Sequence, residues 1–333
     1  MALRKKTLVV GLTYDLKEEY NFKKDDPPDA NAEFDHRDTV ESIKACLESA
    51  GHRVVKIGSV RNLIKRLNSL SVDIVFNIAE GACGRNRESE VPVILEMAGI
   101  PFVGSDGLTL AITLDKVISK KIFISENIPN PAYFEISDSF SLNGIKPHFP
   151  LIVKPRFEGS SKGLNEKSVV RDLKSLKRQA MWINRVYRQS ALVERFIEGS
   201  EFTVAVIGNE NPQALPVVQI RIDRKTSMGA LFYTFSRIHS NSLDYICPAQ
   251  ITKRFEDKLK EIAIRTYRAV ECRDFGRIDI RVDKDNNPYV LEINPLPSLS
   301  REDVFMPIAK YLGISFEEMI LKILKQAVDR YGL

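Results

Sequence analysis

The sequence predicts an α/β protein whose later parts change to an α+β arrangement. In the first hundred residues, short apolar runs alternate with amphipathic segments, as in the βαβα units of a parallel sheet. From residue 115 onward, strand-like runs follow one another more closely, and two helical patterns close the chain. A length of 333 residues suits two or three units with a substantial shared core, on a prior of roughly 150 residues per domain.

Apolar periodicity and helix end signals give the N-terminal elements in order. A strand is expected at residues 7–12. Asp38 with Glu41 has the pattern of a capping box that opens an amphipathic helix, and Gly51 is a stop signal. The pattern then predicts a strand at 53–57, a helix at 61–70, a strand at 72–78 and a helix at 90–98.

A charged segment at residues 17–38 separates the first strand from the first helix. It contains Pro27-Pro28 and has too little apolar content to pack, so the simplest interpretation is a surface loop. Open α/β sheets, however, bind ligands in the loops at the carboxyl ends of their strands. Contact with a substrate is therefore the alternative for this segment.

The later elements follow from the same signals. The patterns predict a helix at 115–126, strands at 132–136, 150–155, 191–195, 202–207 and 215–222, a helix near 255–270, a hairpin within 275–300, and helices at 304–312 and 316–331. No internal repeat, low-complexity tract or extended linker interrupts the sequence. We therefore expect the parts to pack together.

Composition limits the class of protein. Hydrophobic residues make up 44% and charged residues 28%, as in an ordinary globular protein, and the net charge of +5 is dispersed rather than gathered into a basic stripe for nucleic acid. The four cysteines are widely separated, which favours neither a disulfide framework nor a zinc site. No apolar stretch is long enough for a signal peptide core or a membrane span, so the expected location is the cytoplasm.

The segment from Phe275 to Ser300 carries the strongest chemical pattern. A hairpin that turns at Asp285-Asn286 places Arg277 opposite Asn294 and Asp279 opposite Glu292. These four side chains then share one face, while the other face is apolar and consists of Ile278, Ile280, Leu291 and Ile293.

Such a polar face suits a Mg²⁺ site with an adjacent anion clamp, because hard cations take oxygen ligands from carboxylates and phosphates. The alternative is a half-exposed hairpin with ordinary cross-strand charge pairs. That alternative explains Arg277 and Asp279 but gives no reason for Glu292 and Asn294.

Two further segments have the chemistry of nucleotide binding. An apolar strand carries Lys154 and leads into a loop of small residues, Gly159 to Gly163, whose backbone N–H groups can hold phosphate oxygens. The loop lacks the spacing of a P-loop or a dinucleotide fingerprint, and an ordinary turn is the alternative. Glu194, Glu198 and Glu201 follow another apolar strand, where they are either solvated charges or acceptors for an adenine amine and ribose hydroxyls.

Together these residues occur in the order and approximate spacing of the ATP-grasp superfamily. The chain resembles the D-alanine–D-alanine ligases and their relatives, from about residue 40 onward, in these residues and in three further segments: Val75-Phe-Asn77, Gly99-Ile-Pro-Phe-Val-Gly104-Ser105 and Cys247-Pro-Ala249. The resemblance implies an ATP-grasp fold. The expected units are an N-terminal α/β domain at 1–112, a central lobe at 113–200 and a C-terminal lobe with the metal site at 201–333.

The resemblance also implies ATP and Mg²⁺, which Mn²⁺ can replace, as cofactors, with roles for individual residues. Lys116, which follows the helix-capping Asp115, and Lys154 would contact the phosphates, and Ser160 would lie in a mobile phosphate-covering loop. The remaining implied roles are Glu194 for the adenine amine, the backbone of Phe196 and Ile197 for the ring edge, Glu201 for the ribose, Asp279, Glu292 and Asn294 for the metal, and Arg277 for the acyl intermediate.

The implied reaction forms an amide at the expense of ATP. A substrate carboxylate attacks the γ-phosphate to give an acyl phosphate, and an amine then displaces phosphate. Catalysis of such a phosphoryl transfer consists chiefly of positioning and charge neutralisation. Small amino acids or carboxylates are the expected partners, and the family suggests a homodimer through the first domain.

The sequence departs from the family at the amino-acid side of the site. Glu33 is the nearest substitute for the family's substrate-binding glutamate, Arg237 replaces the lysine of a Lys-Tyr pair, and Ser298 can offer a backbone N–H as oxyanion donor. A family His-Gly turn is replaced by the run from Glu80 to Glu88. We therefore expect a D-alanine–D-alanine type ligase, with the same chemistry on another amino acid, peptide or carboxylate as the alternative. A catalytically silent ATP-binding module is the third possibility, against which the complete set of lysines and metal ligands argues.

Overall fold

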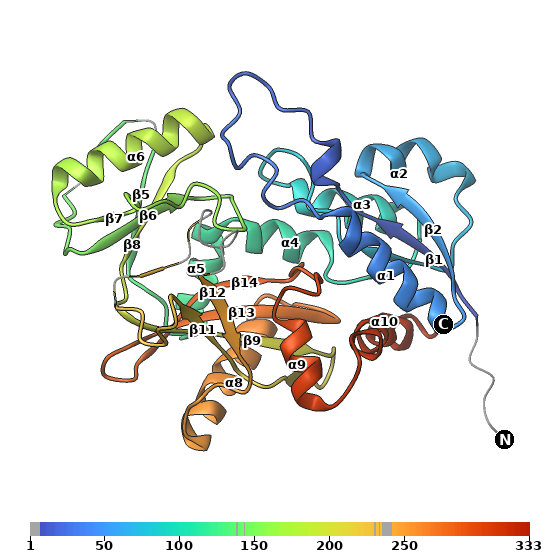
Figure 1. Ribbon diagram of the computed structural model, residues 1–333. Helices are drawn as coiled ribbons and strands as arrows, with labels where there is room; N and C mark the ends of the chain where they lie inside the picture. The colour runs from blue at the N-terminus through green and yellow to red at the C-terminus, as the bar shows by residue number, and fades with distance from the viewer. Residues whose placement is uncertain (1–6, 138, 143, 230, 233, 235–241) are drawn as a thin grey trace.

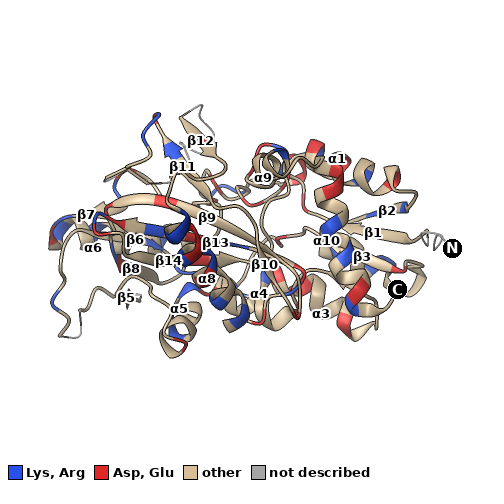
Figure 2. Ribbon diagram, turned by 90° about the horizontal axis from the view of Figure 1, so that it is seen from below, with Lys and Arg blue, Asp and Glu red and all other residues tan. Residues whose placement is uncertain are grey.

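The structure is a computed structural model that describes residues 7–137, 139–142, 144–229, 231–232, 234 and 242–333. It contains a parallel sheet at the N-terminal end and two antiparallel sheets, as Figure 1 shows. The predicted change from an α/β to an α+β arrangement is therefore confirmed. In Figure 2 the Lys and Arg residues and the Asp and Glu residues are both spread over the molecule. None of the described helices is both long and apolar enough to cross a membrane.

The N-terminal sheet has four parallel strands in the order β2-β1-β3-β4. Helices connect the strands, as the alternating pattern predicts. The elements are β1 (Val9–Thr13), α1 (Arg37–Ser49), β2 (Arg53–Gly58), α2 (Val60–Arg66), β3 (Ile74–Asn77), α3 (Glu90–Met97) and β4 (Phe102–Val103), with short 3-10 turns at Lys17–Glu19, Leu67–Ser69 and Arg87–Ser89.

The predicted capping box at the start of α1 is wrong. His36 is the N-cap residue and its side chain makes no capping hydrogen bond, so Asp38 lies one position inside the helix. A carboxylate in the first turn still interacts favourably with the positive end of the helix dipole. The amphipathic pattern located the helix correctly, whereas the end signal displaced its start by two residues.

Two consecutive helices link the N-terminal sheet to the central sheet. These are α4 (Gly107–Leu114), which the sequence interpretation missed, and α5 (Lys116–Ser125). Asp115 caps α5, as predicted, because its side chain accepts hydrogen bonds from the backbone N–H groups of Val117 and Ile118. The cap fixes Lys116 at the first helical position.

The central sheet is antiparallel, with the order β5-β8-β6-β7. Its core contains Val153 and Val193 together with Leu176 and Ile183 of α6, a helix that the sequence interpretation also missed. The elements are β5 (Tyr133–Ile136), β6 (Leu151–Pro155), β7 (Val169–Val170), α6 (Leu173–Tyr187) and β8 (Ala191–Arg195). The Gly-Ser loop at residues 159–163 follows β6 directly.

The C-terminal sheet has the strand order β12-β11-β9-β13-β14, with β10 paired to β9. Its elements are β9 (Gly199–Ile207), β10 (Gln213–Ala214), β11 (Val218–Ile222), β12 (Leu243–Ile246), α8 (Lys253–Ala269), β13 (Phe275–Asp283), β14 (Pro288–Asn294), α9 (Phe305–Leu312) and α10 (Phe316–Tyr331). Helix α10 returns to the N-terminal sheet, where Phe316 and Ile320 share a core with Val40 and Phe76.

The β13–β14 hairpin has the predicted register at its functional end. Arg277 pairs with Asn294 and Asp279 with Glu292. A register shift after Asp279 leaves Leu291 outside the pairing, so its predicted place on the apolar face is wrong, and it instead lines the cavity described below.

The predicted two-residue turn of this hairpin is also wrong. Asp283 donates its backbone N–H to the carbonyl of Asn287 at 3.1 Å, which leaves three residues in the connection. Asn286 supplies the positive φ, +59°, that this connection requires. The bulge at Leu291 compensates for the longer turn and restores the predicted pairing.

Candidate functional site

A cavity of about 670 Å³ lies where the three sheets meet. Loop residues before α1, the Gly-Ser loop, β8, β9 and the hairpin β13–β14 all contribute to its wall. Every predicted site residue that the structure describes lines this cavity: Glu33, Lys116, Lys154, Ser160, Glu194, Phe196, Ile197, Glu201, Arg277, Asp279, Glu292, Asn294 and Ser298. Arg237 lies outside the described residues.

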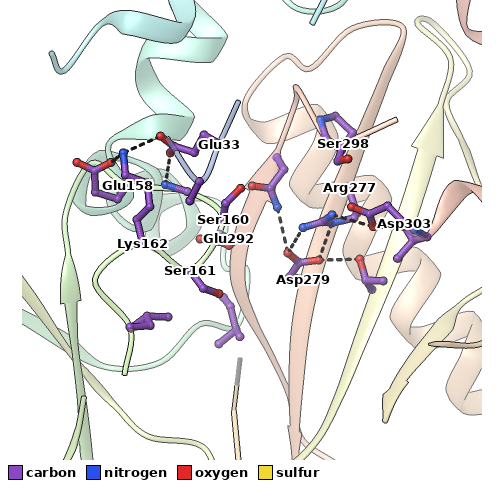
Figure 3. A pocket seen from close by; sticks show the side chains of 18 of the residues that line it. Glu33, Glu158, Ser160, Ser161, Lys162, Arg277, Asp279, Glu292, Ser298 and Asp303 are labelled. Atoms are coloured by element: carbon purple, nitrogen blue, oxygen red, sulfur yellow. Dashed lines mark hydrogen bonds and ion pairs between the residues drawn. The ribbon is translucent and has the colours of Figure 1, made fainter. Parts of the chain in front are cut away.

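Asp279 is the centre of a hydrogen-bonded group on the hairpin (Figure 3). It accepts from Arg277 at 3.1 and 3.0 Å, from the amide nitrogen of Asn294 at 3.0 Å, and from the hydroxyl of Thr203 at 2.6 Å. Arg277 also lies 3.6 Å from Asp303. Thr203 and Asp303 were missed in the sequence, because they lie on β9 and in the loop before α9.

Glu292 faces the lysine at the start of α5. Its carboxylate lies 3.1 Å from Lys116 Nζ, which also donates to the backbone carbonyl of Glu158 at 2.6 Å. Burial raises the pKa of Glu292, but the charges of Lys116 and Lys154 outweigh it and bring the pKa to about 2. Glu292 is therefore ionised at neutral pH, as a metal ligand must be.

The donor set fits a hard cation. Asp279, Glu292 and Asn294 offer carboxylate and carboxamide oxygens on adjacent strands, and Mg²⁺ binds through one or two carboxylates together with phosphate oxygens and water. Within the described part of the chain, no three His, Cys, Asp or Glu residues gather as a metal-binding group. These residues alone thus give an incomplete shell, of the kind that substrate phosphates complete.

Glu194 is enclosed by two lysines at the inner end of the cavity. Lys154 Nζ lies 2.7 Å from one of its oxygens, and Lys120 forms an ion pair with the other. Burial raises the pKa of Glu194, but the two ammonium groups lower it by more than burial raises it. The net pKa is therefore below its ordinary value. Lys120 was not predicted, although it follows Lys116 by four residues on the same helix and therefore shares its face.

Glu201 has different surroundings although it lies nearby. Burial, with help from the negative charges of Asp279 and Glu292, raises its pKa to about 7, even though Arg281 lies 3.4 Å away. Phe196 and Ile197, between the two glutamates, are buried. Ser298 lies in the loop after β14 and is exposed. Its hydroxyl accepts a hydrogen bond from Ser300 N at 3.3 Å.

Glu33 contacts the Gly-Ser loop rather than open space. One oxygen accepts from Gly159 N at 2.5 Å, and the other lies 3.0 Å from Lys162 Nζ. Arg87 forms a further ion pair with Glu33 at 2.5 Å. Burial raises the pKa of Glu33, but the two cations bring it to about 2. Arg87 and Lys162 were present in the segments singled out in the sequence, but nothing local indicated their common partner.

Two acidic side chains on the neighbouring wall of the cavity hold protons more tightly. Burial and the charge of Glu88 raise the pKa of Glu80 well above its ordinary value. Burial together with the charge of Glu33 raises the pKa of Glu88 to about 7 despite the opposing charge of Arg87. Both belong to the segment where the sequence departs from the ligase pattern. This part of the wall therefore combines carboxyl groups of low and of raised pKa.

Comparison with known proteins agrees with this geometry. The family model described as the C-terminus of D-Ala–D-Ala ligases matches residues 135–325. The D-alanine–D-alanine ligase of Desulforamulus reducens is 33% identical over 301 residues, which cover 87% of this chain and 93% of the relative. An uncharacterized protein of Sinorhizobium fredii, y4sG, is 34% identical over 299 residues, 87% and 88% of the two chains.

Solved structures share the fold. D-alanine–D-alanine ligase from Bacillus anthracis, complexed with ATP, superposes with a TM-score of 0.75 at 23% identity and covers 97% of this chain and 98% of its own. VanG D-Ala:D-Ser ligase from Enterococcus faecalis gives a TM-score of 0.71 at 20% identity, with 97% and 100% coverage.

Proposed function

Because this chain belongs to the D-alanine–D-alanine ligase family, we propose that its cavity joins two small amino acids at the expense of ATP. The protein is an ATP-dependent ligase that forms a carbon–nitrogen bond and yields a dipeptide. D-alanine is the proposed substrate for both positions, since the relatives of about one-third identity carry that name. The observation that carries the proposal is the contact between Lys116 and Glu292, which unites the phosphate and metal residues in one cavity.

The proposed roles follow from charge and position. Lys116 and Lys154 neutralise phosphate oxygens, and the backbone N–H groups around Ser160 cover them. Glu194, Glu201 and the backbone of Phe196 and Ile197 hold the adenosine. Asp279, Glu292 and Asn294 would hold Mg²⁺, which supplies further neutralisation of charge on the phosphates.

Arg277 has the proposed role closest to the bond that forms. Its guanidinium is held by Asp279 and Asp303, so its position is fixed before a substrate arrives. There it can stabilise negative charge on the carbonyl oxygen as the amine attacks the acyl phosphate. The backbone N–H of Ser298 and the side chain of Arg237 remain proposals for the same region.

A second substrate pair is favoured by one specific observation. Glu80 and Glu88 add two carboxyl groups with raised pKa values to the wall of the cavity that Glu33 also lines. A cationic group bound beside these two carboxyl groups would favour their ionised forms, so such a wall suits a substrate with an additional cationic group. The same ligase chemistry on a basic amino acid or peptide is therefore the alternative.

The test is a substrate panel. The full chain is incubated with ATP, Mg²⁺ and single or paired amino acids of both configurations, and amide products and ADP are measured by mass spectrometry and a coupled assay. We expect D-alanyl-D-alanine with one ADP for each amide. Another amide in its absence would reassign the substrate, whereas ATP binding without amine-dependent ADP release would favour a silent binding module.

A further inference from the structure

The segment before α1 reaches across the molecule and holds the Gly-Ser loop at both ends. In Figure 1 this dark-blue loop extends from the N-terminal sheet toward α6. At the first end, Glu33 accepts from Gly159 N at 2.5 Å and pairs with Lys162 at 3.0 Å. At the other end, Asp29 accepts from Gly163 N at 2.8 Å. The segment that was predicted to be a surface loop is therefore in contact with the central part of the molecule.

Asp29 has a second partner on the central lobe. The hydroxyl of Tyr187, the last residue of α6, donates to the carboxylate of Asp29 at 2.8 and 2.9 Å. Asp29 is 4% exposed, so this carboxylate is withdrawn from water. A buried carboxylate needs hydrogen-bond donors. Among the described contacts, the donors to the Asp29 carboxylate are Gly163 N and the Tyr187 hydroxyl, both on the central lobe.

The contacts at Glu33 form a connected set. Arg87 donates to Glu33 and to the carbonyl of Phe157 at 2.8 Å, and Lys162 also pairs with Glu158 at 2.6 Å. Figure 3 shows Glu33, Lys162 and Glu158 together, on the opposite side of Ser160 from Arg277 and Asp279. Removal of one member leaves a buried charge without its partner, which is strongly unfavourable.

The loop has the small residues that this approach requires. A Cβ at Gly159 would lie 2.9 Å from the Glu33 carboxylate, and a Cβ at Gly163 would lie 2.4 Å from the ring of Pro155. Between them, Ser160 and Ser161 have φ angles of +45° and +58°, a conformation that costs energy for residues other than glycine. External contacts at both ends are what hold such a strained loop in place.

We propose that Asp29 and Glu33 are positioning residues, which set the Gly-Ser loop over the ATP phosphates only while the N-terminal loop is docked. The inference rests on the proposed function, because it gives that loop its phosphate-covering role. The sequence-based expectation for Glu33 is contact with the substrate, whereas this proposal assigns it to the loop, because its oxygens contact Arg87, Gly159 and Lys162. Docking couples the N-terminal unit to closure of the nucleotide site and excludes water from the acyl phosphate.

The chain provides a matched pair of variants for the test. Tyr187→Phe removes the hydroxyl that binds Asp29 and leaves the ring. Tyr20→Phe removes a hydroxyl that donates to Asp26 at 2.9 Å within the same loop. Asp29→Asn and Asp26→Asn form a second pair, so a folding defect in one variant does not end the test.

We expect the variants at Asp29 and Tyr187 to raise the KM for ATP about fivefold, roughly the effect of one lost hydrogen bond. They should also release more than one ADP for each amide, because water reaches the acyl phosphate, while kcat for total ADP release changes little. The variants at Tyr20 and Asp26 should match the wild type. Unchanged KM and one ADP for each amide in folded Asp29→Asn and Tyr187→Phe would overturn the proposal.

A readout that needs no turnover separates this inference from the proposed function. Hydrogen exchange of amides 159–163 is measured with and without ATP and Mg²⁺. We expect faster exchange in Tyr187→Phe than in Tyr20→Phe, even if no amino acid in the panel gives a product. Equal exchange in the two variants would overturn the positioning role, whereas a lack of amide product from wild-type protein would overturn only the proposed reaction.

Discussion

Lys116 and Glu292 are in contact although they are far apart in the sequence. Their contact at 3.1 Å joins the start of α5 to the last strand of the hairpin. The sequence singled out Glu292 by its place on the polar face of the hairpin, and it singled out Lys116 through the family resemblance. Their common location came from the fold.

The metal proposal makes a prediction at Glu292. Glu292→Gln removes the ligand charge but little volume, so we expect turnover to fall by on the order of 100-fold or more while the thermal transition changes little. Steady-state rates over a Mg²⁺ titration, with circular dichroism, measure both effects. Glu198→Gln, at an exposed site paired with Arg171, is the control. Wild-type activity of Glu292→Gln at ordinary Mg²⁺ would refute the assignment.

The raised pKa of Glu201 predicts a pH dependence of stability. Its pKa is about 7 in the folded protein against 4.5 in the unfolded chain, so the folded state binds more protons between these values. Stability contributed by the protonated form is therefore present below about pH 4.5 and is lost as the pH rises through 7. We expect wild type to lose stability relative to Glu201→Gln over this window in urea titrations, and parallel curves would contradict the shift.

At the scale of elements, the hairpin β13–β14 has the predicted pairing although its predicted turn is wrong. The pairings of Arg277 and Asp279 agree with the predicted register, although the turn is longer than predicted and a bulge at Leu291 compensates. Strand periodicity determines which face each side chain occupies. A turn that is one residue longer, followed by a one-residue bulge, restores the same pairing, so periodicity alone does not reveal either feature.

Helix α5 carries a second prediction. Its face toward the cavity holds Lys116 and Lys120, and Lys120 is 1% exposed against Glu194. Lys154 still pairs with Glu194 in Lys120→Ala, so the variant should lower the free energy of unfolding by about 1–3 kcal/mol, less than a buried charge left without any partner. Lys121→Ala, at the exposed neighbour, should change it by about 0.5 kcal/mol or less. Urea unfolding measures both, and equal effects would contradict the buried pair.

The elements that the sequence missed have a common feature. Helix α4 is apolar on most sides because it lies between units, and α6 follows a loop-rich segment in which strand-like runs dominate the pattern. Burial on several faces hides the 3.6-residue period, so α4 could not be recognised by amphipathicity. In α6, Asp172 and Ser175 form a capping box that a closer reading of helix starts can detect.

At the scale of the whole molecule, the N-terminal and C-terminal units share one core, whereas the central sheet has its own. Asp274 fastens the shared part, because it accepts from Gly104 N at 2.8 Å, from Arg330 at 2.7 Å and from Asn209 at 3.0 Å. These partners belong to the N-terminal unit, to α10 and to the loop after β9. Asp274 thereby holds the segment after β4 against α10 and the loop after β9.

This arrangement predicts separable unfolding. Asp274→Asn leaves Arg330 without its charged partner and should lower the stability of the shared core by about 3–5 kcal/mol. The protein's single tryptophan, Trp182, lies on α6 in the central lobe, so its fluorescence reports that lobe. We expect the circular dichroism transition in urea to shift more than the fluorescence transition. Equal shifts would indicate that the lobes unfold as one unit.

The sequence by itself determined the order and type of most elements, the face of the hairpin that carries Arg277, Asp279, Glu292 and Asn294, and the family resemblance. These features depend on periodicity, caps and spacing within short stretches, which a linear sequence records directly. The gathering of the predicted nucleotide and metal residues in one cavity was expected in outline because several separate segments agreed in their order.

Only the tertiary structure decided which side chains meet across the units. Glu33 contacts Arg87, 54 residues away, and Lys162, 129 residues away, and Asp29 contacts Tyr187 at a separation of 158. A carboxylate in a polar loop has many potential partners in the sequence, and the choice among them depends on how the folded units pack against one another. Burial then removes the competing water, so the partners that packing brings within reach determine both the ionisation of each group and what it can hold.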